Sequence, residues 1–217
     1  MIDVEELKSR LLSHRTMKER FRLPMSEQDA HDELLAAVMA EVTFRNRKFT
    51  IDEVLDKQIW SMARWLTGTS SKFGALLCGE CGNGKSTFLK AFQQLLNYHR
   101  YPNKDFNGEM FGMRIVDTKE IVYLYKENYR DYVKLQRLPM LGIDDLGTEP
   151  AEVMDYGNII TPVVDLITRR YEEQAFTLIT TNLQPKQIRE RYGGRIADRL
   201  NEMVEKIIFE NSSYRTA

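Results

Sequence analysis

The stretch Gly79-Glu80-Cys81-Gly82-Asn83-Gly84-Lys85-Ser86 follows the pattern G-x-x-x-x-G-K-[ST], and Thr87 comes directly after it. An apolar run at 73–78 precedes the stretch, and apolar residues at helical spacing follow it over 85–99. Glycines let such a loop turn its backbone N–H groups inward, and the start of the helix adds the positive end of its dipole. Lys85 can then reach the β- and γ-phosphates of a nucleotide, and the Ser86 hydroxyl can ligate Mg²⁺. The stretch therefore predicts a strand, a phosphate-binding loop and a helix that together bind a nucleotide.

Apolar runs and helical patterns alternate along most of the chain. The runs lie at 73–78, 111–116, 138–143, 176–180 and 206–209, and the helical patterns lie at 85–99, 118–133, 158–173 and, in short pieces, 185–203. Strands that are apolar nearly throughout and alternate with helices form a parallel sheet covered on both faces. Ligands of such sheets bind beyond the carboxyl ends of the strands. We therefore expect an α/β fold with the nucleotide at that edge.

The first 48 residues are predicted to be helical. Apolar residues recur at helical spacing over 4–12 and 34–42, and Ser26 is a candidate helix start before the second pattern. Nine basic and nine acidic residues leave this segment without net charge. A further helix is expected over about 51–65. We expect residues 1–48 to form a helical extension, a candidate docking arm for a partner, and residues 49–217 to form the nucleotide-binding domain.

The composition excludes several classes of protein. The 217 residues are 42% hydrophobic, so the chain can bury a core and is not disordered. Thirty-one Lys and Arg against 32 Asp and Glu give a formal net charge of −1, so any contact with DNA needs a local patch. No run approaches the roughly 18 apolar residues of a membrane helix, and the charged N-terminus is not a signal peptide. We expect a cytoplasmic protein that does not bind membranes.

The two cysteines, Cys78 and Cys81, form a C-x-x-C pattern that can be a redox motif or half of a zinc site. The sequence has no second cysteine pair, and its three histidines are scattered. We therefore expect Cys78 to close the strand, Cys81 to occupy a free position of the loop, and neither to bind a metal.

Two carboxylates, Asp144 and Asp145, end the apolar run at 138–143. In phosphate-loop proteins the first acid of such a pair holds Mg²⁺ through its water shell, and a second acid can orient and deprotonate an attacking water. We expect this strand end to neighbour the strand before the phosphate loop, so that both ends share the γ-phosphate. An Asp-Asp pair before a glycine is also a common turn.

Asn182 directly follows the run at 176–180 and is expected near the same point in space. There its amide can hydrogen-bond the γ-phosphate or the attacking water. The alternative is an ordinary turn or helix-capping asparagine.

Arg195 and Arg199 are four residues apart in a helical pattern and therefore share one face. With Asp198 beside them they can form a solvated ion-pair face. The more specific hypothesis is an arginine finger that one subunit supplies to the active site of its neighbour.

The segments GECGNGKST, LGIDDLG, TLITTNL, ERYGGRIADRL and FENSSYR follow one another in this order. Their set resembles the AAA+ ATPases, and specifically the branch of DnaC-type helicase loaders and IstB-type transposition helpers. The resemblance covers roughly residues 48–217. It implies a five-stranded parallel sheet, and residues 47–51 as a linker that lines the adenine pocket.

The resemblance also implies a role for each site residue. Lys85 and Ser86 would bind phosphate and Mg²⁺, and Asp144 would be the Walker B metal acid. Asp145 would be the catalytic base and Asn182 sensor 1. Arg199 would be the trans finger, with Arg195 as the alternative.

Two departures from the family pattern are expected to matter. Only eight residues follow Phe209, so we expect no complete helical lid of the kind that AAA+ proteins usually carry. No cysteine precedes Cys78, so we expect no cysteine-bearing zinc module like that of the enteric loaders.

A candidate surface for single-stranded DNA lies between 114 and 137, where six basic and four acidic residues occur. Four tyrosines interleave there with cations, and aromatic side chains beside cations suit stacking and phosphate contact. The tyrosines are Tyr123, Tyr125, Tyr129 and Tyr132, and the cations beside them are Lys126, Arg130 and Lys134. Core packing is the alternative for most of these tyrosines, because they also follow helical core spacing.

The leading hypothesis is an ATPase that resembles DnaC-type helicase loaders, hydrolyses ATP at subunit interfaces and acts in DNA replication. Its expected partners are a replicative helicase, single-stranded DNA and further copies of itself. An IstB-type ATPase that assists a transposase would share every catalytic residue. Two more hypotheses are a nucleotide-dependent switch with negligible turnover and a small-molecule kinase, and the paired acids argue against the kinase.

Overall fold

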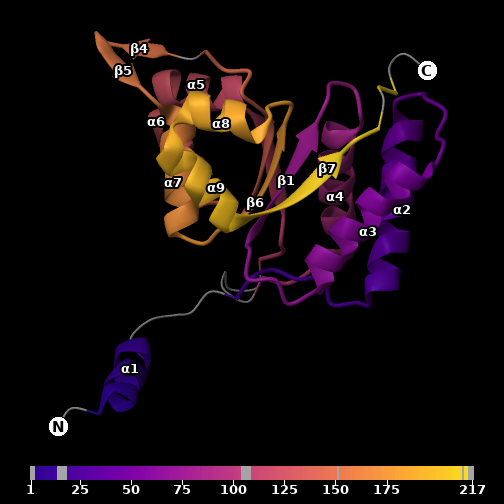
Figure 1. The fold of residues 1–217 in the computed structure, drawn as a ribbon, viewed down its shortest axis with the longest axis horizontal. Coiled ribbons are helices and arrows are strands. Elements are labelled where there is room, and N and C mark those ends of the chain that lie inside the picture. The colour runs from indigo at the N-terminus through magenta and orange to yellow at the C-terminus, as the bar shows by residue number, and fades with distance from the viewer. Residues whose placement is uncertain (1–2, 14–18, 104–108, 151, 212, 215–217) are drawn as a thin grey trace.

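The computed structural model describes residues 3–13, 19–103, 109–150, 152–211 and 213–214 (Figure 1). The helices are α1 (Val4–Ser13), α2 (Glu27–Phe44), α3 (Glu53–Thr67), α4 (Lys85–His99), α5 (Thr118–Glu127), α6 (Tyr129–Arg137), α7 (Pro162–Glu172), α8 (Pro185–Tyr192) and α9 (Gly194–Met203). The strands are β1 (Gly74–Gly79), β2 (Met113–Asp117), β3 (Met140–Leu146), β4 (Val153–Asp155), β5 (Asn158–Ile160), β6 (Phe176–Thr181) and β7 (Val204–Phe209). None of these helices is long and apolar enough to cross a bilayer.

Five strands form one sheet in the order β2-β3-β6-β1-β7, and every pair is parallel. This confirms the expected five-stranded parallel sheet. The expectation that the acidic strand neighbours the phosphate-loop strand is wrong, because β6 lies between β1 and β3. Proximity along the chain does not fix the order of parallel strands, since each is joined to the next by a crossover that can pass over a neighbour.

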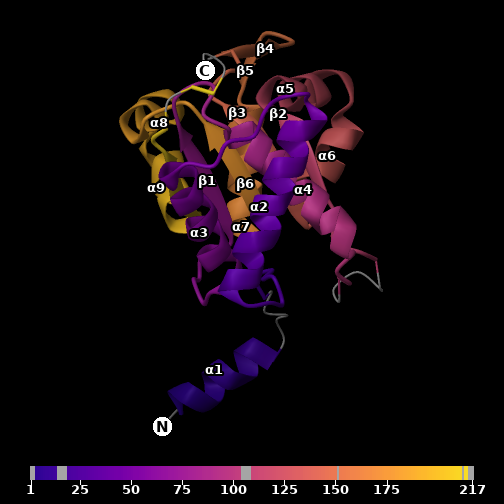
Figure 2. The ribbon, with the colours of Figure 1, turned by 90° about the vertical axis from the view of Figure 1, so that its right-hand side faces the viewer.

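Helices cover both faces of the sheet, as the alternation predicted. On one face α3 and α4 share a core with residues such as Leu77 and Leu178, and α2 packs against α3 and α4 (Figures 1 and 2). On the other face α5 to α9 share a core with Leu76 and Ile179. Successive strand residues point to opposite faces, so a strand buried on both sides must be apolar at nearly every position.

The expected N-terminal extension, residues 1–48, contains two helices that lie in different surroundings. Helix α2 begins at the predicted cap, since the Asp29 N–H donates to the Ser26 hydroxyl at 3.1 Å. It contributes Leu34 and Val38 to the same core as α3 and α4. In contrast, none of the residues of α1 is buried, and Figure 1 draws α1 apart from the sheet and its helices.

Two predicted helices have different bounds. The pattern at 118–133 is two helices, because Asn128 ends α5 and caps α6 by accepting the Asp131 N–H at 3.3 Å. The pattern at 158–173 begins with strand β5, which pairs antiparallel with β4, and the helix starts only at Pro162. Proline favours the first helical position because its missing N–H would have no partner there.

A buried arginine joins the helices to the amino end of the sheet. The Arg170 guanidinium is fully buried and donates to the Thr177 hydroxyl at 2.8 Å and to the carbonyls of Leu138 (2.9 Å) and Phe176 (2.6 Å). Burial lowers the pKa of Arg170 to about 9, which leaves the group charged at pH 7. The Arg170 charge is therefore stabilised by hydrogen bonds to neutral oxygens. Two of these oxygens belong to β6, so the bonds fix α7 to the strand that follows it.

Candidate nucleotide site

The phosphate loop, residues 79–86, leaves the end of β1 and enters α4. Gly84 is the N-cap of α4 with φ of 98°, and its carbonyl accepts the Phe88 N–H at 2.9 Å. This φ lies in the left-handed region that side chains with a Cβ rarely adopt, so the turn into the helix requires glycine. The loop thus presents the free N–H groups at the start of α4, where an anion binds well.

Lys85 is folded into this loop. Its side chain is buried, and its ammonium donates to the carbonyls of Gly79 (2.8 Å) and Glu80 (2.6 Å) and to the Asn83 amide oxygen (2.9 Å). Burial lowers the pKa of Lys85, and the nearby Asp145 carboxylate opposes that shift. The loop therefore holds a desolvated cation at its centre, where it would meet phosphate oxygens strongly.

The structure brings together Ser86 and Asp144, which the sequence predicted as metal ligands. One carboxylate oxygen of Asp144 accepts hydrogen bonds from the Ser86 hydroxyl (2.8 Å) and the Thr180 hydroxyl (2.6 Å). The Thr180 oxygen in turn accepts the Asp145 N–H at 2.8 Å. A hydroxyl and a carboxylate are oxygen ligands that suit Mg²⁺.

Thr180 was not predicted as a site residue. Its hydroxyl bridges the Asp144 side chain and the Asp145 backbone, so it fixes both acids relative to β6. The only signal in the sequence is a polar side chain near the end of an apolar strand. That signal does not say which groups the hydroxyl meets.

Asp145 lies at an irregularity in the pairing of β3 and β6, and its φ of 55° is left-handed. Its carbonyl accepts the hydroxyls of Thr118 (3.2 Å) and Thr148 (3.0 Å). Asn182 is exposed and follows directly on β6, the strand between β1 and β3. The topology therefore places Asn182 at the same sheet edge as the acids and the phosphate loop.

The two arginines of α9 lie in different environments. Arg199 is mostly buried against α7, where it donates to the Thr168 hydroxyl at 2.8 Å, pairs with Glu172 at 3.5 Å and lies over the Tyr171 ring. Arg195 is exposed. Asp198 pairs with Arg189 of α8. Within the described residues, no hydrogen bond or ion pair joins Arg195 or Arg199 to the phosphate loop of their own chain.

A buried carboxylate links the acidic strand end to the helix before α9. Glu149 accepts the Gly147 N–H at 3.1 Å and the Tyr192 hydroxyl, and Arg191 donates to its backbone carbonyl. Burial and the Glu149 carboxylate raise the pKa of Tyr192, so its hydroxyl stays protonated. The turn after β3 and the end of α8 are therefore held together.

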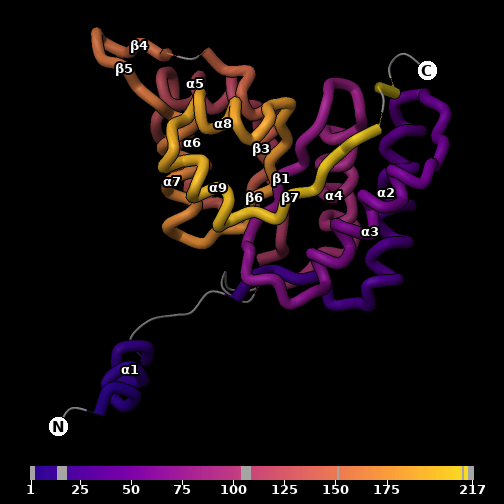
Figure 3. The backbone as a smooth tube through the Cα atoms, viewed as in Figure 1, coloured from indigo at the N-terminus to yellow at the C-terminus, as the bar shows by residue number. Residues whose placement is uncertain are grey.

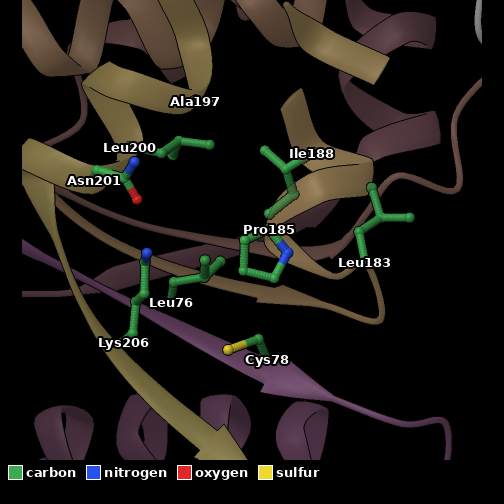
Figure 4. A pocket seen from close by; sticks show the side chains of 9 residues that line it. All are labelled: Leu76, Cys78, Leu183, Pro185, Ile188, Ala197, Leu200, Asn201 and Lys206. Atoms are coloured by element: carbon green, nitrogen blue, oxygen red, sulfur yellow. The ribbon is translucent and has the colours of Figure 1, made fainter. Parts of the chain in front are cut away.

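Two of the cavities in the described part of the chain lie near the end of β1 and near the turn after β3, and they differ in size. A cavity of about 30 Å³ lies between β1 and helices α8 and α9, with Cys78, Ile188 and Lys206 in its lining (Figure 4). It has room for about one water and is too small for a nucleotide. Burial raises the pKa of Cys78, so the group is an ordinary thiol. An open groove of about 460 Å³ runs along α5 beside the turn after β3, lined by Lys119, Tyr123 and Glu149 among others.

No protein-family model matches this sequence, and no curated protein matches it. Among solved structures, the chain is similar to a DnaC helicase loader, with a TM-score of 0.57, 19% identity, and coverage of 75% of this chain and 94% of that one. It is similar to DnaI with a TM-score of 0.58, 19% identity, and coverage of 89% and 95%. It is also similar to the replication initiator DnaA bound to AMPPCP and single-stranded DNA, with a TM-score of 0.54, 12% identity, and coverage of 76% and 49%.

The fold is therefore that of a phosphate-loop AAA+ core. Within that class it is the fold of the DnaC-type helicase loaders, which confirms the resemblance drawn from the sequence at the level of the fold. The same fold is found in the replication initiator.

If the cluster binds Mg²⁺ and a nucleotide, replacing Thr180 with valine should weaken Mg²⁺-dependent nucleotide binding by about tenfold, because Asp144 then loses a charge-assisted hydrogen bond of the kind that orients it. Titration of a fluorescent ATP analogue with and without Mg²⁺ measures the effect. Thr180→Ser should restore binding. Thr181→Val is the control. It removes a buried hydroxyl one residue away, which donates to the Leu146 carbonyl and not to Asp144. An equal loss of binding affinity in both valine variants would contradict the role of the Thr180 hydroxyl in positioning Asp144.

Proposed function

We propose that this protein is an Mg²⁺-dependent ATPase that resembles the DnaC-type helicase loaders and acts in DNA replication. The observation that carries the proposal is the cluster at the carboxyl edge of the sheet. There Lys85 is buried in the phosphate loop, and the Asp144 carboxylate binds the hydroxyls of Ser86 and Thr180. ATP is the proposed ligand of residues 79–87, and Mg²⁺ that of Ser86 and Asp144.

Each residue of the site has a role in hydrolysis that fits its chemistry. Lys85 binds the β- and γ-phosphate oxygens, while Ser86 and Asp144 hold Mg²⁺, which when bound neutralises phosphate charge. Asp145 orients the attacking water and accepts its proton. Asn182 hydrogen-bonds the γ-phosphate or that water.

We propose that a neighbouring copy completes the site with an arginine from α9. Arg199 remains the first candidate on the resemblance, and its guanidinium would have to leave Thr168 and Glu172 of its own chain to reach a neighbour. Arg195 is the alternative, and its exposure leaves it accessible to a neighbour. Either assignment makes self-association depend on ATP, because the bound γ-phosphate lies between two subunits.

The proposed surface for single-stranded DNA consists of the exposed faces of α5 and α6. Two of the four tyrosines pack in the core and are not available to DNA. Tyr132 is buried and donates to the Pro162 carbonyl at 2.8 Å, and Tyr125 packs against it. Tyr123 and Tyr129 are 62% and 58% exposed, so their rings are available for stacking on bases. Lys126, Arg130 and Lys134 are also exposed on these helices and can pair with phosphates.

A direct hydrogen bond connects α5, the helix that carries part of this surface, to the proposed catalytic base Asp145. Thr118, the first residue of α5, is fully buried and donates to the Asp145 carbonyl at 3.2 Å. A strand bound on α5 would therefore act on the backbone of the proposed base. This contact supports hydrolysis that responds to DNA.

The proposed partner is a replicative helicase, in the cytoplasm, with a transposase as the alternative. Helix α1 supports a docking role for the N-terminal segment, because Val4, Leu7, Leu11 and Leu12 of its apolar pattern are all exposed. The catalytic site is the same in both proposals. Co-purification with a helicase or with a transposase distinguishes them.

Replacing Lys85 with alanine should weaken ATP binding by about 100-fold, because the loop then loses its buried cation. A fluorescent nucleotide titration measures binding, and phosphate release measures hydrolysis with and without single-stranded DNA. Lys90→Ala, an exposed lysine of the same helix, is the control. Tight ATP binding by Lys85→Ala would rule out the site, whereas binding without turnover in the wild type would favour a nucleotide switch.

Arg199→Ala and Asp145→Asn should each lose hydrolysis while binding ATP, since an arginine finger contributes on the order of a thousandfold to turnover. Mixed in equal amounts, they should recover activity at about a quarter of the interfaces, where an intact Asp145 meets an intact Arg199. A second mixture, of Arg195→Ala with Asp145→Asn, tests the alternative arginine. The arginine whose variant loses hydrolysis alone and recovers it in the mixture is the finger. Light scattering should show that the mixtures assemble, and assembled mixtures without recovery would exclude a finger in trans.

Replacing Tyr123 and Tyr129 together with alanine should weaken binding of single-stranded DNA at least tenfold, because each ring can stack on one base. Fluorescence anisotropy with a labelled oligonucleotide measures this at fixed salt. Tyr98→Ala removes a tyrosine that is 81% exposed on α4 and should leave binding unchanged. Unchanged DNA affinity in the double variant would contradict the proposal that single-stranded DNA binds on α5 and α6.

A further inference from the structure

Described residues that follow β7 return to the phosphate loop. After β7, which runs parallel to β1 and pairs Phe209 with Gly79, the chain continues past the end of β1 (Figure 3). There Phe209, Asn211 and Tyr214, which we call the C-terminal strap, bind the loop and helix α3. The site described above does not use these residues.

Asn211 ties the loop to α3. Its side chain is buried, and its amide N–H donates to the Asn83 carbonyl at 3.0 Å. Its amide oxygen accepts the side-chain N–H of Gln58, a buried residue of α3, at 3.0 Å. One asparagine therefore holds the loop backbone and a core helix at once.

Tyr214 holds the loop from its outer side. Its backbone N–H donates to the Gly82 carbonyl at 3.0 Å, and its hydroxyl donates to the Asp52 carboxylate at 3.2 Å. Its ring lies against Gly84, with one ring carbon 3.6 Å from the position that a Cβ on Gly84 would take. Asp52 also caps α3 by accepting the Leu55 N–H, so the tyrosine joins the loop to the start of that helix.

A relay of hydrogen bonds runs from the strap to the lysine. The buried Asn83 donates its amide N–H to the Phe209 carbonyl at 2.7 Å, and its amide oxygen accepts the Lys85 ammonium at 2.9 Å. A Cβ on Gly79 would collide with the same Phe209 carbonyl, so the strap and the loop are in direct contact. The position of Lys85 therefore depends on the strap.

We propose that the C-terminal strap is a positioning element for the phosphate loop, which keeps the loop and Lys85 in the conformation that binds phosphate. The inference rests on nucleotide binding in the proposed function and adds a determinant of affinity outside the motif. A loop that contains three glycines loses much conformational entropy when it becomes ordered, and contacts that order it beforehand remove that cost from binding. Anchorage on Asp52 and Gln58 makes α3 the rigid support.

The experiment compares Asn211→Ala, Tyr214→Ala and Tyr214→Phe in the chain of 217 residues. Titration of a fluorescent ATP analogue should show roughly tenfold weaker binding for Asn211→Ala and Tyr214→Ala. Tyr214→Phe keeps the ring and should bind within about threefold of the wild type. Hydrogen exchange of residues 79–87 should be faster in the two alanine variants, in the absence of nucleotide.

Asn103→Ala is the matched control, because Asn103 is a buried asparagine in the segment between α4 and β2. Thermal melting sets a temperature at which all variants are folded, and Asn103→Ala should bind ATP like the wild type there. If Asn211→Ala does not fold, the comparison of Tyr214→Ala with Tyr214→Phe decides. Unchanged binding in Tyr214→Ala, or tighter binding, would overturn the proposal, since tighter binding would make the strap an inhibitor. Lys85→Ala in the same titration tests the proposed function separately.

Discussion

The parallel register of β1 with its two neighbours places the whole site. Cys78 pairs with Thr181 of β6 on one side and with Ile208 of β7 on the other, so the phosphate loop leaves the sheet between two strand ends. On the β6 side the Thr180 hydroxyl brings in the two acids of β3. On the β7 side the Phe209 carbonyl meets the Asn83 amide. A shift of β1 by one residue would separate the loop from both and exchange its two buried faces.

Local patterns in the sequence were enough to predict part of the candidate site. The phosphate loop, Ser86 and Asp144 are set by spacing and by their place at the end of an apolar run, and the structure brings Ser86 and Asp144 into contact. The parallel sheet followed from the alternation of strands and helices. These features need no knowledge of which segments meet in space.

The rest depends on contacts between residues far apart in the sequence. Thr180 lies 36 residues from Asp144, and Asn211 lies 128 residues from Asn83, so no local pattern marks either one. The expected neighbour of the phosphate-loop strand was wrong for the same reason, because the pairing of strands is also a contact between distant segments. The break at Asn128 was missed because α5 and α6 both pack on the same core, so the helical spacing continues across the cap.

The turn after β3 also restricts how the sequence can change. Glu149 is buried, and its carboxylate accepts the Tyr192 hydroxyl and pairs with the Arg191 guanidinium at 3.6 Å. Both partners belong to α8, which leads directly into the helix that carries Arg195 and Arg199. A buried carboxylate that loses its partners costs several kcal/mol, and so do partners left without the carboxylate. Single substitutions at Glu149, Arg191 or Tyr192 are therefore penalised, whereas a concerted replacement is not. In evolution the three positions should vary as one unit, although 42 residues separate the first from the second.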